Sequence, residues 1–392
     1  MKKREEFGKK FIYFILILWL STEILFNTAI ENFFGWKRGE LNDVMAYVIL
    51  IMLLVQMVFF QSYKVSEMVI ISLITAFVAF ATINSNHHTM MSTWIFIVAA
   101  KHIDFDRMVG IAYFVQLIMI AIVFYMFING YIKEDLIYRG SILRHSLGFS
   151  HPNQLGIRIF LLLVSRCYYR KNKLNFIDVG VVIVAAIFVN KVANSKTSYY
   201  ALIMLAVISS IYVLLRILHN DMKILANVAI AVGIIANIGS VILSTIELNK
   251  HQILNSLNIF MSKRFSQCHR TMKYYGVELF GQDVQLIVKR PIVGVVYHFW
   301  LDNAYMSILL RYGVVVFLIF SMLYFATMLY LKRTSKVYLL MIMALYSIYG
   351  IMENNFFSMS QNLFLLTLSF PLYVHATNND RENILSRIRV TW

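Results

Sequence analysis

Side chains that bind anions gather between Arg144 and Arg158, a segment that also holds His151, Pro152 and Asn153. Proline suits the first position of a helix, so we expect a helix to begin at Pro152 with its unpaired backbone N–H groups facing outward. Such a helix end attracts anions. Arg158 follows His151 by about two helical turns and shares its face, and a charge at that depth in a membrane helix usually faces a cavity.

This first cluster predicts an anion-binding helix end and a functional role for His151. Two alternatives remain at this point. In the first alternative, His151 is simply a surface residue at the start of the helix. In the second, the Arg158 side chain extends along the helix until its charge reaches water.

A second group of cations lies in a long segment from Glu247 to about Asp302, where Ser262-Lys263-Arg264 and Arg270 precede Phe280-Gly281. Arginine grips phosphate oxygens with two parallel hydrogen bonds and keeps its charge. These residues therefore predict a pyrophosphate site at the membrane surface. The alternative is a loop that docks on anionic lipid headgroups.

A third group begins at Asp302-Asn303-Ala-Tyr305. Asn303, Ser307 and Arg311 recur every four residues and form one polar stripe on a helix. Asp302 stands at the top of this stripe, where it can act as a general base or pair with an outer arginine. A capping role for Asp302 at the start of the helix is the alternative.

Two weaker signals are Lys196, in Asn-Ser-Lys-Thr before a predicted helix, and Glu353, which precedes two asparagines. Each also fits a solvated loop. His87 and His88 lack the spacing of metal ligands, so no metal site is predicted. The chain has no phosphate-binding glycine loop, so we expect no chemistry driven by cytoplasmic ATP and no cofactor.

The composition indicates which elements must position these residues. Of the 392 residues, 59% are hydrophobic and 14% are charged, whereas soluble domains carry about 25% charged residues. With only three prolines and 16 glycines, the apolar runs favour helices. We expect an all-α polytopic membrane protein of about 12 spanning helices that forms one integral membrane domain over residues 1–392. The expected helices cover 11–30, 41–61, 66–84, 90–101, 107–129, 152–168, 176–192, 197–217, 223–246, 303–331, 336–352 and 357–375.

The basic residues in the loops predict the orientation. Placing both termini in the cytoplasm puts most loop cations inside, among them Lys2 to Lys10, Arg166 to Lys173 and the tail residues Arg381 and Arg387. The net charge of +16 is then explained by topology and anionic lipid rather than by nucleic acid. The segment 247–302 becomes one long extracytoplasmic loop.

The motifs together resemble the Wzy-type polymerases of O-antigen and capsule, relatives of the O-antigen ligases. The resemblance rests on four stretches: Gly148 to Gly156, Ser262-Lys-Arg264, Asp302-Asn-Ala-Tyr305 with Gly313, and Tyr349-Gly-Ile-Met-Glu353. Ligases of this superfamily carry histidine where this chain has Asp302, which favours a polymerase. They also carry arginine in a Ser-Arg-Thr motif where this chain has Lys196.

The resemblance implies a GT-C-like helical fold in the cell membrane and transfer of a glycan from its undecaprenyl-pyrophosphate carrier to an incoming lipid-linked repeat unit, without a metal. The expected partners are undecaprenyl-pyrophosphate-linked oligosaccharides and membrane lipid, with a chain-length regulator as a candidate. Arg264, Asp302 and His151 are the predicted catalytic residues. The predicted substrate-binding residues are Arg144, Asn153, Arg158, Lys196, Arg270, Asn303, Tyr305, Arg311 and Glu353. Two other functions remain open: a flippase or transporter of lipid-linked oligosaccharides, and an O-antigen-type ligase.

Overall fold

The computed structural model describes residues 2–33, 35–101, 103–134, 136–219, 221–290, 295–373 and 389–390. The predicted inner residues Arg381 and Arg387 lie outside these ranges, as does most of the polar tail. The chain folds into two compact units. Unit 1 comprises 1–62, 99–222 and 391–392, and unit 2 comprises 63–98 and 223–390.

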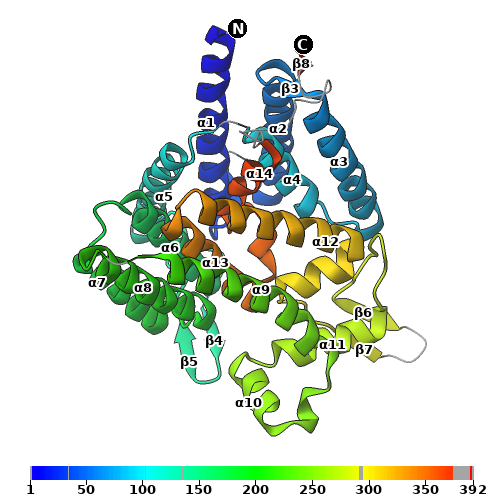
Figure 1. The fold of residues 1–392 in the computed structure, drawn as a ribbon. Coiled ribbons are helices and arrows are strands. Elements are labelled where there is room, and N and C mark those ends of the chain that lie inside the picture. The colour runs from blue at the N-terminus through cyan, green and yellow to red at the C-terminus, as the bar shows by residue number, and fades with distance from the viewer. Residues whose placement is uncertain are drawn as a thin grey trace. The chain divides into compact units, whose positions relative to one another are not determined.

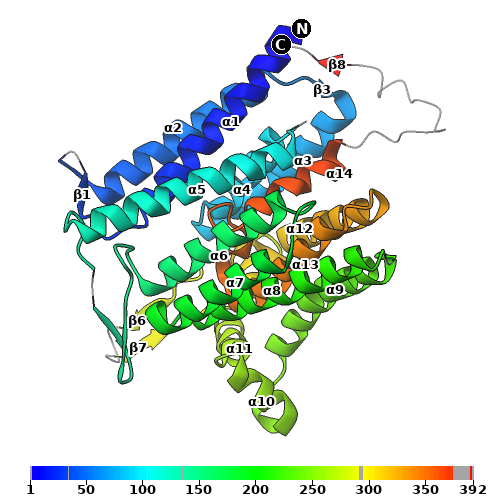
Figure 2. The same ribbon diagram turned by 90° about the vertical axis from the view of Figure 1, so that its left-hand side faces the viewer.

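Unit 1 is built from long helices joined by short turns and hairpins. Its elements are α1 (Lys2–Leu25), β1 (Asn32–Phe33), β2 (Trp36–Lys37), α2 (Arg38–Phe59), α5 (Phe105–Ile128), β4 (Ile137–Arg139), β5 (Ile142–Arg144), α6 (Pro152–Tyr169), α7 (Phe176–Phe188), the π-helical turn η1 (Val189–Ala193) and α8 (Lys196–Ile217). Helix α1 packs against α2 and α5, as Figure 2 shows, while α6 packs against α5 and α8.

Unit 2 contains the long segment that follows α9. Its elements are β3 (Tyr63–Lys64), α3 (Val65–Ser85), most of α4 (Thr89–Ala99), α9 (Lys223–Thr245), η2 (Leu248–Lys250), α10 (Gln252–Phe260), α11 (Arg264–Tyr275), β6 (Ile287–Arg290), β7 (Val295–His298), α12 (Ala304–Arg333), α13 (Val337–Met352), η3 (Asn354–Phe357), η4 (Leu363–Leu368), α14 (Ser369–Tyr373) and β8 (Arg389–Val390). Helices α9, α12 and α13 lie side by side in Figure 1 and contact one another.

The chain is a multi-pass helical membrane protein. Within the described residues, seven helices are long and apolar enough to cross a membrane: α2, α3, α5, α7 with η1, α8, α9 and α12. Exposed apolar residues such as Ile83 and Ile235 cover their outer faces, as expected where the solvent is lipid. The expectation of about 12 crossings and a GT-C-like fold stays a prediction, as does the single integral membrane domain.

Each predicted helix up to 336–352 corresponds to an observed helical stretch, with α7 and η1 together covering 176–192. The last predicted helix is only partly correct. The prediction of one helix over 357–375 is wrong at its start, because the helical stretch begins only at Leu363, where η4 runs directly into α14 over Leu363–Tyr373. Residues 374–375 lie outside the described ranges. The polar side chains before Leu363 compete with helical backbone bonds. The Ser358 hydroxyl accepts from the amide of Ser360, and the Asn362 side chain donates to the carbonyl of Phe356.

The end of the first helix was also predicted wrongly. Helix α1 stops at Leu25 rather than continuing to residue 30. The Asn27 side chain donates to the carbonyl of Glu23, and the Thr28 hydroxyl donates to that of Leu25. These side chains satisfy carbonyls that would otherwise need a further helical turn.

Helix α12 is broken at Gly313, which has φ 85° and ψ 173°. The loop from Glu278 to Gln282 lies against the break. The amides of Val314 and Val315 donate to the carbonyls of Glu278 and Leu279, and the amide of Gln282 donates to the carbonyl of Arg311. The broken backbone is therefore hydrogen-bonded by protein, which is a requirement for irregular backbone at membrane depth.

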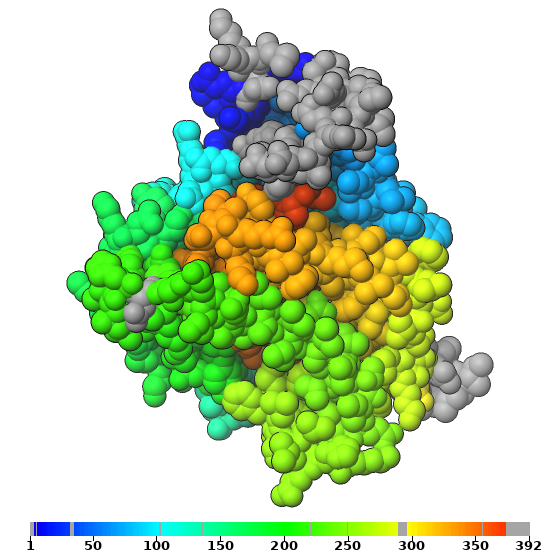
Figure 3. All heavy atoms as spheres, viewed as in Figure 1, coloured from blue at the N-terminus to red at the C-terminus, as the bar shows by residue number. Residues whose placement is uncertain are grey.

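The long segment 247–302 is largely structured where it is described. It contains two short helices, α10 and α11, and the β6–β7 hairpin. A buried cluster that includes Cys268, Leu301, Met306 and Leu310 joins α11 to the start of α12. Figure 3 shows the atoms of α10 and α11 (yellow-green) on the viewed surface.

Candidate functional site

Arg264, Asp302 and Glu353 meet in unit 2. One terminal nitrogen of Arg264 lies 3.2 Å from a carboxylate oxygen of Asp302, and the other lies 3.8 Å from one of Glu353. The Asp302 side chain is 44% exposed and that of Glu353 is 18% exposed. The site therefore combines one fixed cation with two carboxylates, one of which is open to water.

Three separate chain segments deliver these side chains. Arg264 is the first residue of α11, directly after Lys263 in the left-handed region. The buried Asn258 holds this turn, because its side chain bonds to both the amide and the hydroxyl of Ser266. Glu353 ends α13, where its amide donates to the carbonyl of Tyr349.

Asn303 fixes the position of Asp302. The side-chain oxygen of Asn303 accepts a hydrogen bond from the backbone amide of Met306 and thereby caps α12. The side-chain nitrogen of Asn303 donates to the Ser240 hydroxyl of α9. Capping by Asp302, the alternative drawn from the sequence, is therefore wrong, and Asp302 pairs with Arg264 instead. Asn303 is fully buried, so it positions its neighbour rather than being open to a substrate.

Tyr305 and Arg311 also belong to the packed part of unit 2. The hydroxyl of Tyr305 donates to the carbonyl of Ser347 on α13, 2.9 Å away, inside the core. Arg311 lies just before the break in α12 and acts electrostatically on Asp283 and His87. The pKa of His87 is lowered, first by burial and second by the charge of Arg311.

Arg270 lies on a different face of α11 from Arg264. It follows Arg264 by six residues, which corresponds to about 9 Å along a helix. One of its terminal nitrogens donates to the carbonyl of His298 at 2.7 Å, and its guanidinium lies over the ring of Trp300. Arg270 therefore contacts an aromatic surface rather than the two carboxylates.

Unit 1 holds the other predicted residues around the start of α6. Arg144 is buried, and it donates to the Ala193 carbonyl at the end of η1 and to the Asn153 side chain at 2.6 Å. Burial, and then the charge of Arg139, lower the pKa of Arg144 to about 10. Arg144 therefore remains a cation at neutral pH.

His151 caps α6. Its Nδ1 atom accepts a hydrogen bond from the amide of Asn153 at 3.0 Å, so this nitrogen carries no proton. Burial, followed by the charges of Arg144 and Arg139, lowers the pKa of His151. The ring is therefore neutral with its proton on Nε2, which makes it a hydrogen-bond donor rather than a base in this arrangement.

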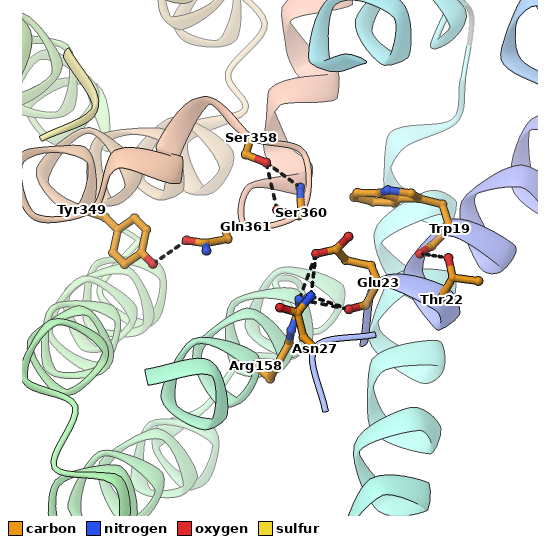
Figure 4. A network of polar contacts seen from close by, with 9 residues as sticks. All are labelled: Trp19, Thr22, Glu23, Asn27, Arg158, Tyr349, Ser358, Ser360 and Gln361. Atoms are coloured by element: carbon orange, nitrogen blue, oxygen red, sulfur yellow. Dashed lines mark hydrogen bonds and ion pairs between the residues drawn. The ribbon is translucent and has the colours of Figure 1, made fainter. Parts of the chain in front are cut away.

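The buried Arg158 forms an ion pair with Glu23 of α1 (Figure 4). Its side chain is only 3% exposed, and a terminal nitrogen lies 3.1 Å from the Glu23 carboxylate. Asn27 donates to the same carboxylate oxygen at 3.0 Å. The alternative in which Arg158 extends to water is wrong. The Glu23 side chain is 22% exposed, so the pair is partly buried, and it ties α6 to α1.

Figure 4 also draws polar contacts that belong to unit 2. The hydroxyl of Tyr349 donates to the side chain of Gln361. Tyr349 lies on α13, four residues before Glu353. Lys196 of unit 1, by contrast, is exposed in the first turn of α8 and has no hydrogen-bonded partner among the described residues. Its predicted contact with substrate stays a prediction.

The predicted residues divide between the two units. The structure brings Arg264, Asp302 and Glu353 together in unit 2, and Arg144, His151 and Asn153 together in unit 1. Within the described ranges, no three His, Cys, Asp or Glu side chains are placed to hold a metal ion.

Sequence reasoning missed two acids that organise unit 1. One is Glu23, the partner of Arg158. The other is Glu134, whose carboxylate accepts from the amides of Ser146 and Leu147 and lies 2.8 Å from His145. Burial alone would raise the pKa of Glu134, but these hydrogen bonds lower it. An acid within an apolar helix was the available signal for Glu23, because such a charge needs a partner.

Comparison with known protein families, curated proteins and solved structures finds no match for this chain.

Proposed function

We propose that this membrane protein is a glycosyltransferase that polymerises undecaprenyl-pyrophosphate-linked oligosaccharide repeat units on the outer face of the cell membrane. The meeting of Arg264, Asp302 and Glu353 carries this proposal. It combines a cation suited to a diphosphate with a water-accessible carboxylate suited to accept a proton. The motif resemblance of the same residues supplies the substrate class.

The proposed reaction joins the growing glycan to the incoming unit. A hydroxyl oxygen at the non-reducing end of that unit attacks C1 of the sugar attached to the carrier. The new C1–O bond forms as the bond from C1 to the diphosphate oxygen breaks. The diphosphate leaves with the bonding electron pair, and Asp302 accepts the hydroxyl proton, so no oxidant or reductant is needed.

Exchange of the ion-pair partner of Arg264 links departure of the diphosphate to deprotonation of the acceptor hydroxyl. A partly exposed ion pair such as that with Asp302 contributes about 1 kcal/mol or less. Two charge-assisted hydrogen bonds to a diphosphate are stronger, so the donor displaces Asp302 from the arginine. The carboxylate is then released to act on the acceptor hydroxyl, and Arg264 stabilises the charge that develops on the leaving group. Help from Arg144 stays a prediction.

Substitution of Arg264 tests this role. We expect Arg264→Ala to abolish long polymer while the protein remains inserted in the membrane, because no other cation contacts both carboxylates among the described residues. Lys250→Gln is the matched control, since it removes an exposed charge of the same segment and should leave polymer length unchanged. Normal chain lengths in a well-expressed Arg264→Ala variant would refute the assignment.

One observation favours a second function, a flippase or transporter of the same lipid-linked oligosaccharides. Transporters often use helices interrupted within the membrane, and α12 is broken at Gly313. In unit 2, however, the loop Glu278–Gln282 fills this break with hydrogen bonds, whereas a transport site requires groups open to a substrate. We therefore place the polymerase first.

Deletion of the protein followed by glycan analysis separates the candidate functions. Single repeat units at the cell surface would indicate a polymerase. Accumulation of repeat units on the cytoplasmic side would indicate a flippase. Long chains that remain on the lipid carrier would indicate an O-antigen-type ligase.

A further inference from the structure

An open cleft of about 600 Å³ lies in unit 2 between α11 and the strand β7 with the residues that follow it. Its lining includes Arg270, Lys273, Tyr274, Tyr297, Phe299 and Trp300. The cleft thus combines aromatic rings with cations, and no carboxylate side chain is among its described lining residues.

The aromatic rings form a preassembled surface. Phe299 is buried, and its ring lies 4.8 Å from that of Tyr274 and 6.5 Å from that of Tyr297, with Tyr297 inclined by only 14°. Trp300 stacks on His298 and is 44% exposed. Because buried Phe299 supports the exposed rings, a ligand would not have to order them, which reduces the entropic cost of binding.

Arg270 sits at the edge of this aromatic surface. Its guanidinium carbon lies 5.4 Å from the ring centre of Trp300 and 6.0 Å from that of Phe299. Of its five N–H groups, the described contacts occupy only the bond to the His298 carbonyl. No carboxylate in the described ranges forms an ion pair with Arg270, so its charge remains available to an anionic ligand.

Lys273 adds a second cation one turn further along α11. The charge of Lys273 acts on Glu247, which is already paired with Lys250 at 2.7 Å. A ligand in the cleft would therefore meet net positive charge. Neutral glycans gain nothing from such charge, whereas a carboxylate or phosphate on a sugar forms charge-assisted hydrogen bonds with it.

Sugar rings fit the remaining surface. One face of a pyranose presents C–H groups, and these pack against the electron-rich face of an aromatic ring. The cleft is also tied to the candidate site at both ends, because Trp300 precedes Asp302 by two residues and Arg270 shares α11 with Arg264. The segments that carry Arg264 and Asp302 therefore also supply residues of the cleft.

We propose that the cleft between α11 and β7 binds an acidic segment of the glycan, with its sugar rings on Trp300 and Tyr297 and its carboxylate or phosphate on Arg270. The proposal rests on the proposed function for the origin of the glycan, but it makes a binding claim that can be measured separately. The competing occupant is an anionic lipid headgroup, since tryptophan, tyrosine and arginine also gather at membrane interfaces.

The binding experiment uses the full chain in nanodiscs of neutral lipid, titrated with a hyaluronan hexasaccharide as the acidic probe and chitohexaose as the neutral one. We expect the acidic probe to bind at least about tenfold more tightly, because only the acidic probe can form a charge-assisted hydrogen bond with Arg270. Trp300→Ala and Arg270→Gln should each weaken its binding about tenfold or more. Trp300→Phe should retain most of it, and Trp36→Phe, at an exposed tryptophan of β2, should change nothing.

Three outcomes would overturn the proposal: no binding of the acidic probe that depends on Trp300, equal binding of the neutral probe, or loss of the probe when anionic lipid replaces neutral lipid. The last result would assign the surface to a lipid headgroup. The thermal unfolding midpoint of each variant verifies that it is folded.

A cellular experiment separates this inference from the proposed function. If both hold, Trp300→Ala shortens the polymer while short chains persist, and Arg264→Ala eliminates polymer. Full-length polymer in Trp300→Ala would refute glycan binding in the cleft without contradicting the proposed polymerase function. Unchanged surface glycan after deletion of the whole protein would refute the polymerase function. The binding titration alone would then test whether the cleft binds an acidic glycan.

Discussion

The two carboxylates around Arg264 differ in their access to water, and this difference predicts different roles. Asp302 is the more exposed and lies closer to the guanidinium, whereas Glu353 is largely covered. A proton acceptor must reach the acceptor hydroxyl, which favours Asp302. Glu353 is then a positioning residue that holds Arg264 while its other partner is exchanged.

Isosteric substitutions test this division. We expect Asp302→Asn to reduce polymer formation by about 100-fold or more, the usual contribution of general base catalysis, and Glu353→Gln to reduce it by less than about tenfold. Chain formation is measured in cells that lack the native protein, at matched expression. A greater loss in Glu353→Gln than in Asp302→Asn would reverse the two roles.

His151 predicts a pH dependence of stability. Its pKa in the folded protein lies below the ordinary value of 6.5, so between these two values the unfolded chain binds more protons. The free energy of unfolding therefore falls as the pH drops through about 6.5, because protonation places a charge on a partly buried ring that lies near the cations Arg144 and Arg139.

The variant His151→Asn isolates this effect, since asparagine also caps a helix but does not titrate. We expect the thermal unfolding midpoint of the native protein to fall more steeply than that of the variant between pH 7.5 and 5.5. Other titrating groups, including His87, are present in both proteins and cancel in the difference. Parallel curves would show that the titration of His151 does not contribute to the pH dependence of stability.

At the scale of the element, the break in α12 depends on two glycines that approach each other. A Cβ atom on Gly313 would lie 2.4 Å from the amide nitrogen of Gly281, and one on Gly281 would lie 2.4 Å from the carbonyl oxygen of Arg311. Both glycines also have positive φ. The contact between the loop and the broken helix therefore requires glycine on both sides.

We expect Gly313→Ala to destabilise the protein by about 3 kcal/mol or more, since a backbone conformation confined to glycine costs about 1–3 kcal/mol before the steric overlap is added. Gly239→Ala in α9 is the control, because its nearest described neighbour would lie at an ordinary 3.9 Å. The measurement is the thermal unfolding midpoint in detergent. Equal unfolding midpoints for the two variants would show that α12 tolerates a side chain at residue 313.

The elements were predictable from sequence to different extents. Long apolar runs gave the positions of α5, α8 and α9 within a few residues, because spanning helices must satisfy their own backbone groups. The break at Gly313 was not predictable, since its conformation depends on hydrogen bonds from a loop more than thirty residues earlier in the chain. The helix predicted after residue 357 was placed wrongly, because composition alone does not reveal side chains that form hydrogen bonds with the backbone.

The candidate site was predicted as residue types but not as one constellation. Arg264, Asp302 and Glu353 were each identified from local chemistry, yet their meeting depends on the packing of α11, α12 and α13 in unit 2. Arg270 shows the opposite case. Its type suggested a phosphate contact, but the helical rotation from Arg264 directs it to an aromatic cleft.

At the scale of the whole molecule, the distribution of cations links the fold to the proposed function. A net charge of +16 on an otherwise apolar chain fits loops on the cytoplasmic side, but Arg264, Arg270 and Lys273 belong to the segment predicted to lie outside. The orientation of the chain therefore decides whether these cations can meet a lipid-linked substrate at the outer surface.

Cysteine labelling tests this orientation. Ser256 in α10 and Thr334 between α12 and α13 are both exposed, and the spanning helix α12 separates them in the chain. The native Cys167 and Cys268 are buried and should give little background. In intact cells, a membrane-impermeant maleimide should label Ser256→Cys, whereas Thr334→Cys should react only after permeabilisation. The reverse pattern would place Arg264 and Asp302 on the cytoplasmic side, where the proposed transfer to an external glycan is impossible.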